Sequence, residues 1–205
     1  MEWHKTDVQG LAVIDAEIEG YKPAQYEIIR QVIYATADFE YKDLIQFSDQ
    51  ALEKGSAAIA ARTSIVVDVA SLQMAITSTL QSTFANASYI CTSVITRPQK
   101  QKSQAAWGME TLAQRYPSAI FVIGESQSAL EALTDMIATQ NIAPALVIAT
   151  PAEFINIGVA KSQLQHSNIP YILINGQKGG AMVAAKVLTA LISLAWEVYG
   201  TKDDF

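Results

Sequence analysis

The chain has 205 residues, of which 50% are hydrophobic and 17% charged, so it can bury a sizeable core as one domain. The formal net charge is −6 and the lysines and arginines are scattered, which argues against a nucleic-acid-binding surface. The apolar runs at 118–124 and 144–150 are too short to span a bilayer, and the first residues do not resemble a signal peptide. We therefore expect a cytoplasmic protein with no membrane partner. A single cysteine, Cys91, excludes an internal disulfide and fits a reducing compartment.

The first expected helix begins near Pro23, a residue favoured in a first helical turn, and extends to about Ala35. From about residue 44 onward, short β-branched and apolar runs alternate with helix-length amphipathic segments. The expected strands are 64–68, 89–92, 119–123, 145–149 and 171–174. The expected helices are 49–62, 99–115, 126–140, 160–165 and 180–199. This alternation predicts a single α/β domain over residues 1–205, with three α/β/α layers and a mostly parallel central sheet.

Three loops that follow expected strands carry polar or glycine-rich sequence. They read Gly124-Glu-Ser-Gln-Ser, Thr150-Pro-Ala-Glu-Phe and Asn175-Gly-Gln-Lys-Gly-Gly. In an open α/β sheet, ligands bind beyond the carboxyl ends of the strands, where such loops gather. The last loop precedes a helix, so its backbone N–H groups could cradle an anion. Alternatively, its glycines provide only a flexible connection.

Common motifs for metal and nucleotide sites are missing from the sequence. Two histidines, His4 and His166, and one cysteine cannot supply the four ligands of a closed zinc site, so we expect no metal site. His166 follows a helix in a polar stretch and is expected on the surface. The dinucleotide, P-loop and hydrolase-elbow patterns do not occur. Cys91 follows an apolar run and is interpreted as a buried structural thiol.

Six segments, taken in order, resemble the precorrin-8X methylmutase (cobalt-precorrin-8 methylmutase) family over almost the whole chain after about residue 23. They are Val32-Ile-Tyr-Ala-Thr-Ala-Asp-Phe, Ser64-Ile-Val-Val-Asp-Val, Ile95-Thr-Arg-Pro, Gly124-Glu-Ser-Gln-Ser-Ala-Leu, Pro144-Ala-Leu-Val-Ile-Ala-Thr-Pro-Ala-Glu-Phe and Lys178-Gly-Gly-Ala-Met-Val-Ala-Ala. The resemblance implies an isomerase that moves a methyl group within ring C of precorrin-8X or cobalt-precorrin-8, giving hydrogenobyrinate or cobyrinate in cobalamin biosynthesis. It also implies no cofactor, and a homodimer with the active site near the subunit interface.

The resemblance further implies which residues bind the polycarboxylate tetrapyrrole. The expected substrate-binding residues are Thr96, Arg97, Ser126, Lys178, Gly179 and Gly180. Arg97 would open a helix and pair with a substrate carboxylate, while Thr96 would cap that helix or donate a hydroxyl hydrogen bond. The loop at Ser126 and the two glycine amides would offer anion sites at helix N-termini, and Lys178 would add a mobile cation. The alternatives are a surface ion pair for Arg97, a cap alone for Thr96 and a solvated Lys178.

The expected catalytic residue is Tyr34, at a position where the family pattern has a histidine credited with proton transfer. An unperturbed tyrosine has a pKa of about 10, against about 6.5 for histidine, so Tyr34 keeps its proton at neutral pH. Three interpretations follow. Tyr34 is the general acid, or it orients the ring while another group supplies the proton. In the third, the protein has lost much of its activity and serves as a corrinoid carrier.

Other positions also depart from the family pattern. Glu153 stands where glycine is usual, and it would repel substrate carboxylates unless it points away. The residues after Asp68 are Val-Ala-Ser in place of the frequent Glu-Met, and the stretch between Cys91 and Thr96 is shorter than in many members. A further alternative is an unrelated α/β enzyme that binds a small phosphorylated ligand at Gly179 and Gly180.

Overall fold

The computed structural model describes residues 5–94, 101–154 and 158–200. Their strands form one sheet in the order β1-β6-β5-β4-β2-β3. The strands are β1 (Ile45–Phe47), β2 (Ile65–Val67), β3 (Ser88–Ile90), β4 (Ile120–Ile123), β5 (Leu146–Ala149) and β6 (Tyr171–Ile174). The helices are α1 (Lys5–Asp15), α2 (Pro23–Thr36), α3 (Tyr41–Leu44), α4 (Ala51–Ala60), α5 (Ala70–Gln81), α6 (Gln104–Arg115), α7 (Gln127–Ala138), α8 (Val159–Gln165) and α9 (Ala181–Tyr199), with a 3-10 turn at Cys91–Ser93.

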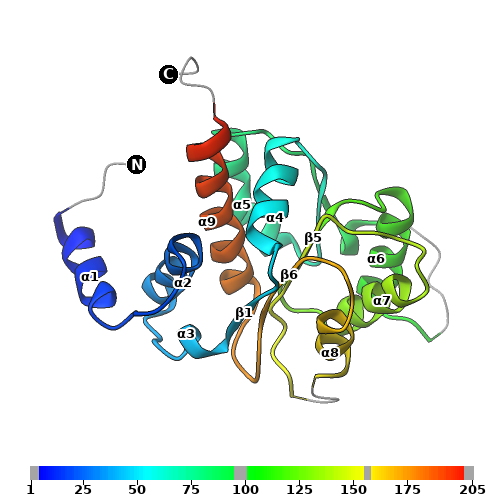
Figure 1. The fold of residues 1–205 in the computed structure, drawn as a ribbon. Helices are drawn as coiled ribbons and strands as arrows, with labels where there is room; N and C mark the ends of the chain where they lie inside the picture. The colour runs from blue at the N-terminus through cyan, green and yellow to red at the C-terminus, as the bar shows by residue number, and fades with distance from the viewer. Residues whose placement is uncertain (1–4, 95–100, 155–157, 201–205) are drawn as a thin grey trace.

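The sheet is parallel except at one edge, where β1 pairs antiparallel with β6. Helices α2, α4, α5 and α9 cover one face, and α6, α7 and α8 cover the other (Figure 1). The predicted α/β architecture with a mostly parallel sheet between two helical layers is confirmed.

Both faces of the central strands are buried, which explains their continuous apolar runs. Along β2, Ile65 and Val67 point into the core under α2, α4, α5 and α9, whereas Val66 points into the core under α6 and α7. All three side chains are 0% exposed. Burying a side chain of this size contributes about 1.5–3 kcal/mol, so alternate residues stabilise the two helical layers separately.

Helix α9 is the central helix of the first layer. It packs against α2, α4 and α5, and its small alanines let the helices approach closely (Figure 1). With 19 residues and a mean hydropathy of 1.6, it has the length and composition of a membrane span, a feature the sequence analysis did not recognise. Most of its residues between Ala181 and Ala195 are buried in the core of the subunit.

Four elements were not expected from the sequence: α1, α3, β1 and α5. Strand β1 has only three residues and α3 only four, so neither shows a periodic pattern. Helix α6 begins at Gln104, later than the expected residue 99, because the hydroxyl of Ser103 accepts a hydrogen bond from the Ala106 amide at 3.1 Å. The expected helix opening at Thr96 and Arg97 falls outside the described residues.

Candidate active site

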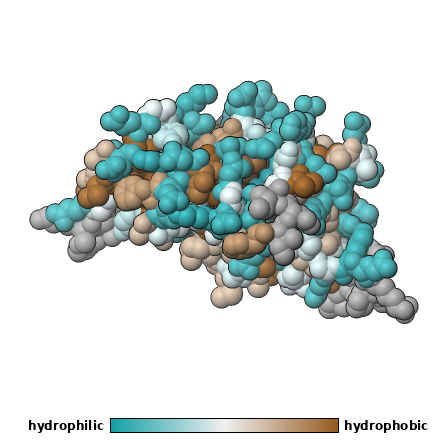
Figure 2. Space-filling view, turned by 90° about the horizontal axis from the view of Figure 1, so that it is seen from below, coloured by the Kyte–Doolittle hydropathy of each residue, from teal (hydrophilic) through white to brown (hydrophobic). Residues whose placement is uncertain are grey.

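A pocket of about 450 Å³ lies at the carboxyl ends of the parallel strands. Its walls come from the loops after β4 (Gly124, Glu125), β5 (Ala152, Phe154) and β6 (Gln177, Lys178, Gly179, Gly180), together with Asp38 and Tyr41 after α2. Figure 2 looks onto this end of the molecule, where apolar residues form separate patches among hydrophilic ones. The volume falls within the range of about 300–1,000 Å³ that small-molecule sites occupy, and the position is the one where α/β sheets bind ligands.

The loop after β4 is held by a buried carboxylate. Asp68, which follows β2 and is 0% exposed, accepts hydrogen bonds from the amides of Gly124 at 3.0 Å, Glu125 at 2.7 Å and Ser126 at 2.7 Å. The Ser126 hydroxyl accepts from the Ala129 amide at 3.2 Å and so caps α7. The amides that were expected to form an anion site at Ser126 therefore already bind an internal anion.

The glycine-rich loop after β6 is packed tightly against the loop after β5. The amide of Gly180 donates to the carbonyl of Thr150 at 2.9 Å, and the Thr150 hydroxyl donates to the carbonyl of Gly180 at 3.0 Å. At Gly179 the φ angle is +145°, and a Cβ atom there would lie 2.0 Å from the Thr150 carbonyl oxygen. Close backbone approach thus requires Gly179, and the Gly180 amide is already occupied.

Lys178 is bound by two carboxylates at the rim of the pocket. Its ammonium nitrogen lies 2.5 Å from Asp38 Oδ2 and 2.8 Å from Glu40 Oε2. These hydrogen bonds raise the pKa of Lys178, and the bond from Lys178 lowers the pKa of Asp38. The expectation of a mobile cation is wrong. Asp38 and Glu125 place two negative charges in the pocket wall against one positive charge on Lys178.

Tyr41 brings a phenol into the pocket that the sequence analysis did not single out. Its side chain is 5% exposed, and it lines the pocket beside Asp38 and Lys178. Burial raises the pKa of Tyr41 and the nearby charge of Asp38 raises it further, whereas a hydrogen bond from the Gly179 backbone acts in the opposite direction. Tyr41 therefore keeps its proton at neutral pH, so it can donate a hydrogen bond or act as an acid but not as a base. The polar and aromatic run directly after α2 is the signal that could have pointed to it.

The remaining expected site residues are distributed as follows. Tyr34 lies on α2, one turn before Asp38, and is 36% exposed, with its ring close to Gly10 of α1. It is not among the residues lining this pocket. Thr96 and Arg97 lie outside the described residues. The structure thus brings Lys178, Gly179 and Gly180 together with the loop that precedes Ser126, and leaves Tyr34 on the neighbouring helix surface.

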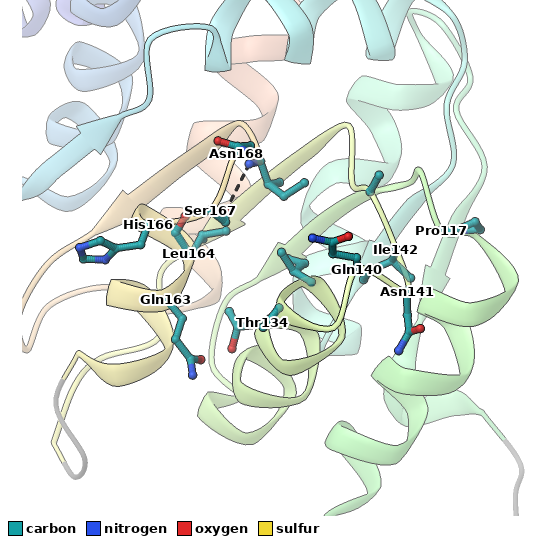
Figure 3. Close-up of a pocket in the computed structure, with 14 residues that line it drawn as sticks. Pro117, Thr134, Gln140, Asn141, Ile142, Gln163, Leu164, His166, Ser167 and Asn168 are labelled. Carbon is teal, nitrogen blue, oxygen red and sulfur yellow. Dashed lines mark hydrogen bonds between the residues drawn. The ribbon is translucent and has the colours of Figure 1, made fainter.

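A second pocket, of about 820 Å³, lies between α7 and α8 (Figure 3). Among the described residues that line it there is no lysine or arginine. His166 contributes to its wall, but in Figure 3 its ring points away from Thr134, Gln140 and Asn141. As expected, His166 is exposed on the surface. This pocket is larger, yet it lies away from the carboxyl ends of the strands and lacks cations for an acidic ligand, so we place the candidate site in the smaller one.

Cys91 is buried next to the site and is expected to be unreactive in the folded protein. Its side chain is 0% exposed and its Sγ donates to the carbonyl of Asp68 at 3.2 Å. Burial raises the pKa of the Cys91 thiol to about 12, and the charge of Asp68 adds to this effect. At pH ~8, iodoacetamide should react about 1,000-fold more slowly than with a free thiol, because the thiolate is so scarce. Equal labelling rates with and without denaturant would contradict this expectation.

Comparisons with known proteins show which family the chain belongs to. The model of the precorrin-8X methylmutase family matches residues 7–194. The chain belongs to this family. Precorrin-8X methylmutases are isomerases. The chain is 32% identical to a cobalt-precorrin-8 methylmutase of Synechocystis, covering 94% of this chain and 96% of that protein.

Further relatives show that the likeness extends to the fold. A cobalt-precorrin-8 methylmutase of Leptospira interrogans is 30% identical, with 91% of each chain covered. The crystal structure of a precorrin-8X methylmutase from Thermus thermophilus superposes with a TM-score of 0.84 at 31% identity, covering 95% of this chain and 99% of the other. The family resemblance inferred from the six sequence segments is confirmed.

Proposed function

We propose that the protein catalyses the methyl migration within ring C of precorrin-8X or cobalt-precorrin-8, giving hydrogenobyrinate or cobyrinate in cobalamin biosynthesis. The match of the family model over residues 7–194 carries this proposal. The pocket at the carboxyl ends of the strands supports it, because four separate segments of the chain converge there around a phenol and an ammonium group. The shift needs a group that protonates the ring system, and no organic cofactor is part of the proposal.

The substrate carries many carboxylates, so the acidic pocket wall must be offset by other groups. Helix α9 begins at the pocket rim, and within the described residues its first turn has neither an acidic side chain nor a side-chain cap. Its amides and dipole therefore provide a positive end for a substrate carboxylate. We propose that Arg97, with Thr96 beside it, supplies the permanent positive charge. Lys178, Gly179 and the hydroxyl of Ser126 complete the proposed binding surface.

We propose Tyr34 as the acid, although it lies on α2 four residues before the pocket-lining Asp38 and does not itself line the pocket. Tyr34→Phe should lower kcat by about tenfold or more while changing KM little, because it removes one donor and hardly any contact area. Steady-state kinetics on the purified protein would measure this. Tyr199→Phe, at an exposed position near the far end of α9, is the matched control.

The same experiment discriminates between the two phenols. Tyr41→Phe removes the phenol that lines the pocket. If Tyr41→Phe lowers kcat and Tyr34→Phe does not, the assignment of Tyr34 as the acid is wrong and the proton donor is inside the pocket.

We also propose a homodimer of one-domain subunits in the cytoplasm, with the active site near the interface. The continuous sheet supports the single domain over residues 1–205. Apolar side chains exposed on α1 and on neighbouring α2, namely Val8, Val13 and Tyr34, support a contact with a second copy beside the site. Sedimentation of a single species at the monomer mass at micromolar concentration would contradict the dimer.

Turnover of the substrate tests the proposed function directly. Purified protein is mixed with precorrin-8X, and in a parallel sample with cobalt-precorrin-8, and the visible spectrum is followed. We expect the spectrum to change to that of the corresponding product with one of the two substrates. Tight binding of hydrogenobyrinate without any turnover would instead show a corrinoid carrier. Neither binding nor turnover would contradict both functions.

A further inference from the structure

A buried ammonium group lies behind the pocket and has no part in the mechanism above. Lys161 on α8 is 3% exposed. Its Nζ donates to the carbonyl oxygens of Pro151 at 2.8 Å and Ile174 at 2.5 Å, and it lies 3.2 Å from Glu153 Oε1. Three acceptors thus meet the three N–H groups of an ammonium. Such complete pairing is what makes a buried charge tolerable, because an unpaired one would be very costly.

The partners of Lys161 belong to two loops that form the pocket. Pro151 and Glu153 follow β5, and Ile174 is the last residue of β6. Glu153 also joins the loops directly: its amide donates to the Gly176 carbonyl at 3.1 Å, and its Oε2 accepts from the Gly176 amide at 3.2 Å. The lining residues lie immediately beside these bonds, with 152 and 154 flanking Glu153 and 177–180 following Gly176. The ammonium therefore cross-links the two loops from behind.

Glu153 is directed at Lys161 and does not line the pocket. Its side chain is 13% exposed, and its two oxygens contact Lys161 and Gly176. The repulsion of substrate carboxylates considered from the sequence therefore does not arise. Burial lowers the pKa of Lys161, and the charge and hydrogen bond of Glu153 act in the opposite direction. Glu153 thus favours the ammonium form, which has the three donors that the two loops use.

We propose that Lys161 and Glu153 form a positioning pair that fixes the two loops in register, so that affinity for the substrate depends on a cation that does not touch it. This inference rests on the proposed function of the same pocket. The positions of the two loops matter because a displacement of about 1 Å is enough to weaken binding at a preorganised site.

The test compares four variants: Lys161→Met, Glu153→Gln, the double variant, and Lys54→Met on the exposed surface of α4 as a charge-matched control. Lys161→Met should raise KM for precorrin-8X and Kd for hydrogenobyrinate by about tenfold, with kcat changed by less than about threefold. Lys54→Met should change neither. Unaltered KM and Kd in folded Lys161→Met would overturn the proposal.

The double variant separates positioning from general stability. Lys161→Met alone leaves a buried carboxylate without its partner, whereas the double variant removes both charges and should recover much of the lost resistance to urea. Affinity should not recover, because the link from α8 to the two carbonyl oxygens is still missing. Affinity that returns together with stability would show a merely structural role.

Two further measurements apply if Lys161→Met does not fold. Glu153→Gln keeps an oxygen for the Gly176 amide but removes the charge that favours the ammonium form, so the pKa of Lys161 should fall. As the pH is raised, affinity for hydrogenobyrinate should therefore be lost at a lower pH than in the unmodified protein. An unchanged pH profile of Kd would overturn the proposal. Hydrogen exchange of the ligand-free protein should be faster in the loops at 150–154 and 175–180 in Glu153→Gln than in Lys54→Met. Hydrogen exchange needs no ligand, so it tests the positioning pair even if the unmodified protein neither binds hydrogenobyrinate nor turns over substrate. That outcome would contradict the proposed function and leave the link between the two loops to be judged by the exchange rates.

Discussion

Gly179→Ala is expected to lower the free energy of unfolding by more than about 3 kcal/mol and to weaken substrate binding by more than about tenfold. Two effects combine at this residue. The φ angle of +145° is strained for any residue with a side chain, and the new Cβ would lie 2.0 Å from the Thr150 carbonyl oxygen. That oxygen belongs to the backbone and accepts the bond from the Gly180 amide, so it cannot move without separating the two loops that line the pocket.

Gly180→Ala and Gly20→Ala are the controls for this prediction, to be measured by urea unfolding and by titration with hydrogenobyrinate. Both glycines have positive φ angles, +105° and +83°, but a Cβ at either position would meet nothing within 4 Å. Each should cost about 1–2 kcal/mol from backbone strain alone, and Gly20→Ala should leave binding unchanged. If Gly179→Ala costs no more than Gly180→Ala, close approach to Thr150 is not what selects glycine at position 179.

Asp68→Ala is expected to lower the free energy of unfolding by about 3–5 kcal/mol, because it leaves the three amides of the loop after β4 without an acceptor. For a chain of this size, such a loss corresponds to a fall in Tm of roughly 10 °C or more. Asp68→Asn should cost about 2 kcal/mol, since its single oxygen can still accept hydrogen bonds but carries no charge. Urea unfolding and calorimetry would measure both.

Asp135→Ala on the exposed surface of α7 is the control, and it should change stability by less than about 0.5 kcal/mol. The Asp68 variants should also bind the substrate less tightly, because Gly124 and Glu125 line the pocket. Asp68→Ala with the stability of Asp135→Ala would mean that the three amides find other partners, and would remove Asp68 as the organiser of this loop.

The layered fold could be predicted from local patterns, since strands such as 119–123 and 145–149 are continuously apolar and alternate with amphipathic helices. The predictions failed where an element was too short for a pattern, as in β1 and α3. They also failed for α5, whose apolar residues Leu72, Ile76 and Leu80 recur at helical spacing but are interspersed with serine, threonine and glutamine. The family resemblance did not depend on these elements, because its six segments lie mostly at strand ends and loops.

The positions of the site residues were harder to predict. The sequence marked the loops correctly, yet it could not show which of their amides remain available, because that depends on partners far along the chain. Asp68 lies 56–58 residues from the amides it binds, and Lys178 is 140 residues from Asp38. Lys161 carried no signal, being one lysine in a short amphipathic helix.

By itself, the order of apolar and polar residues determined a mostly parallel sheet between two helical layers, because burial of alternate side chains is a local property of each strand. The six motif segments, and not this order, carried the resemblance to the family. Only the tertiary structure decided that Asp68 occupies the amides near Ser126, that Lys178 forms ion pairs with Asp38 and Glu40, and that Glu153 turns toward Lys161. The reason is physical: a buried donor, acceptor or charge takes whichever partner the fold brings within about 3 Å, and sequence distance does not reveal that partner.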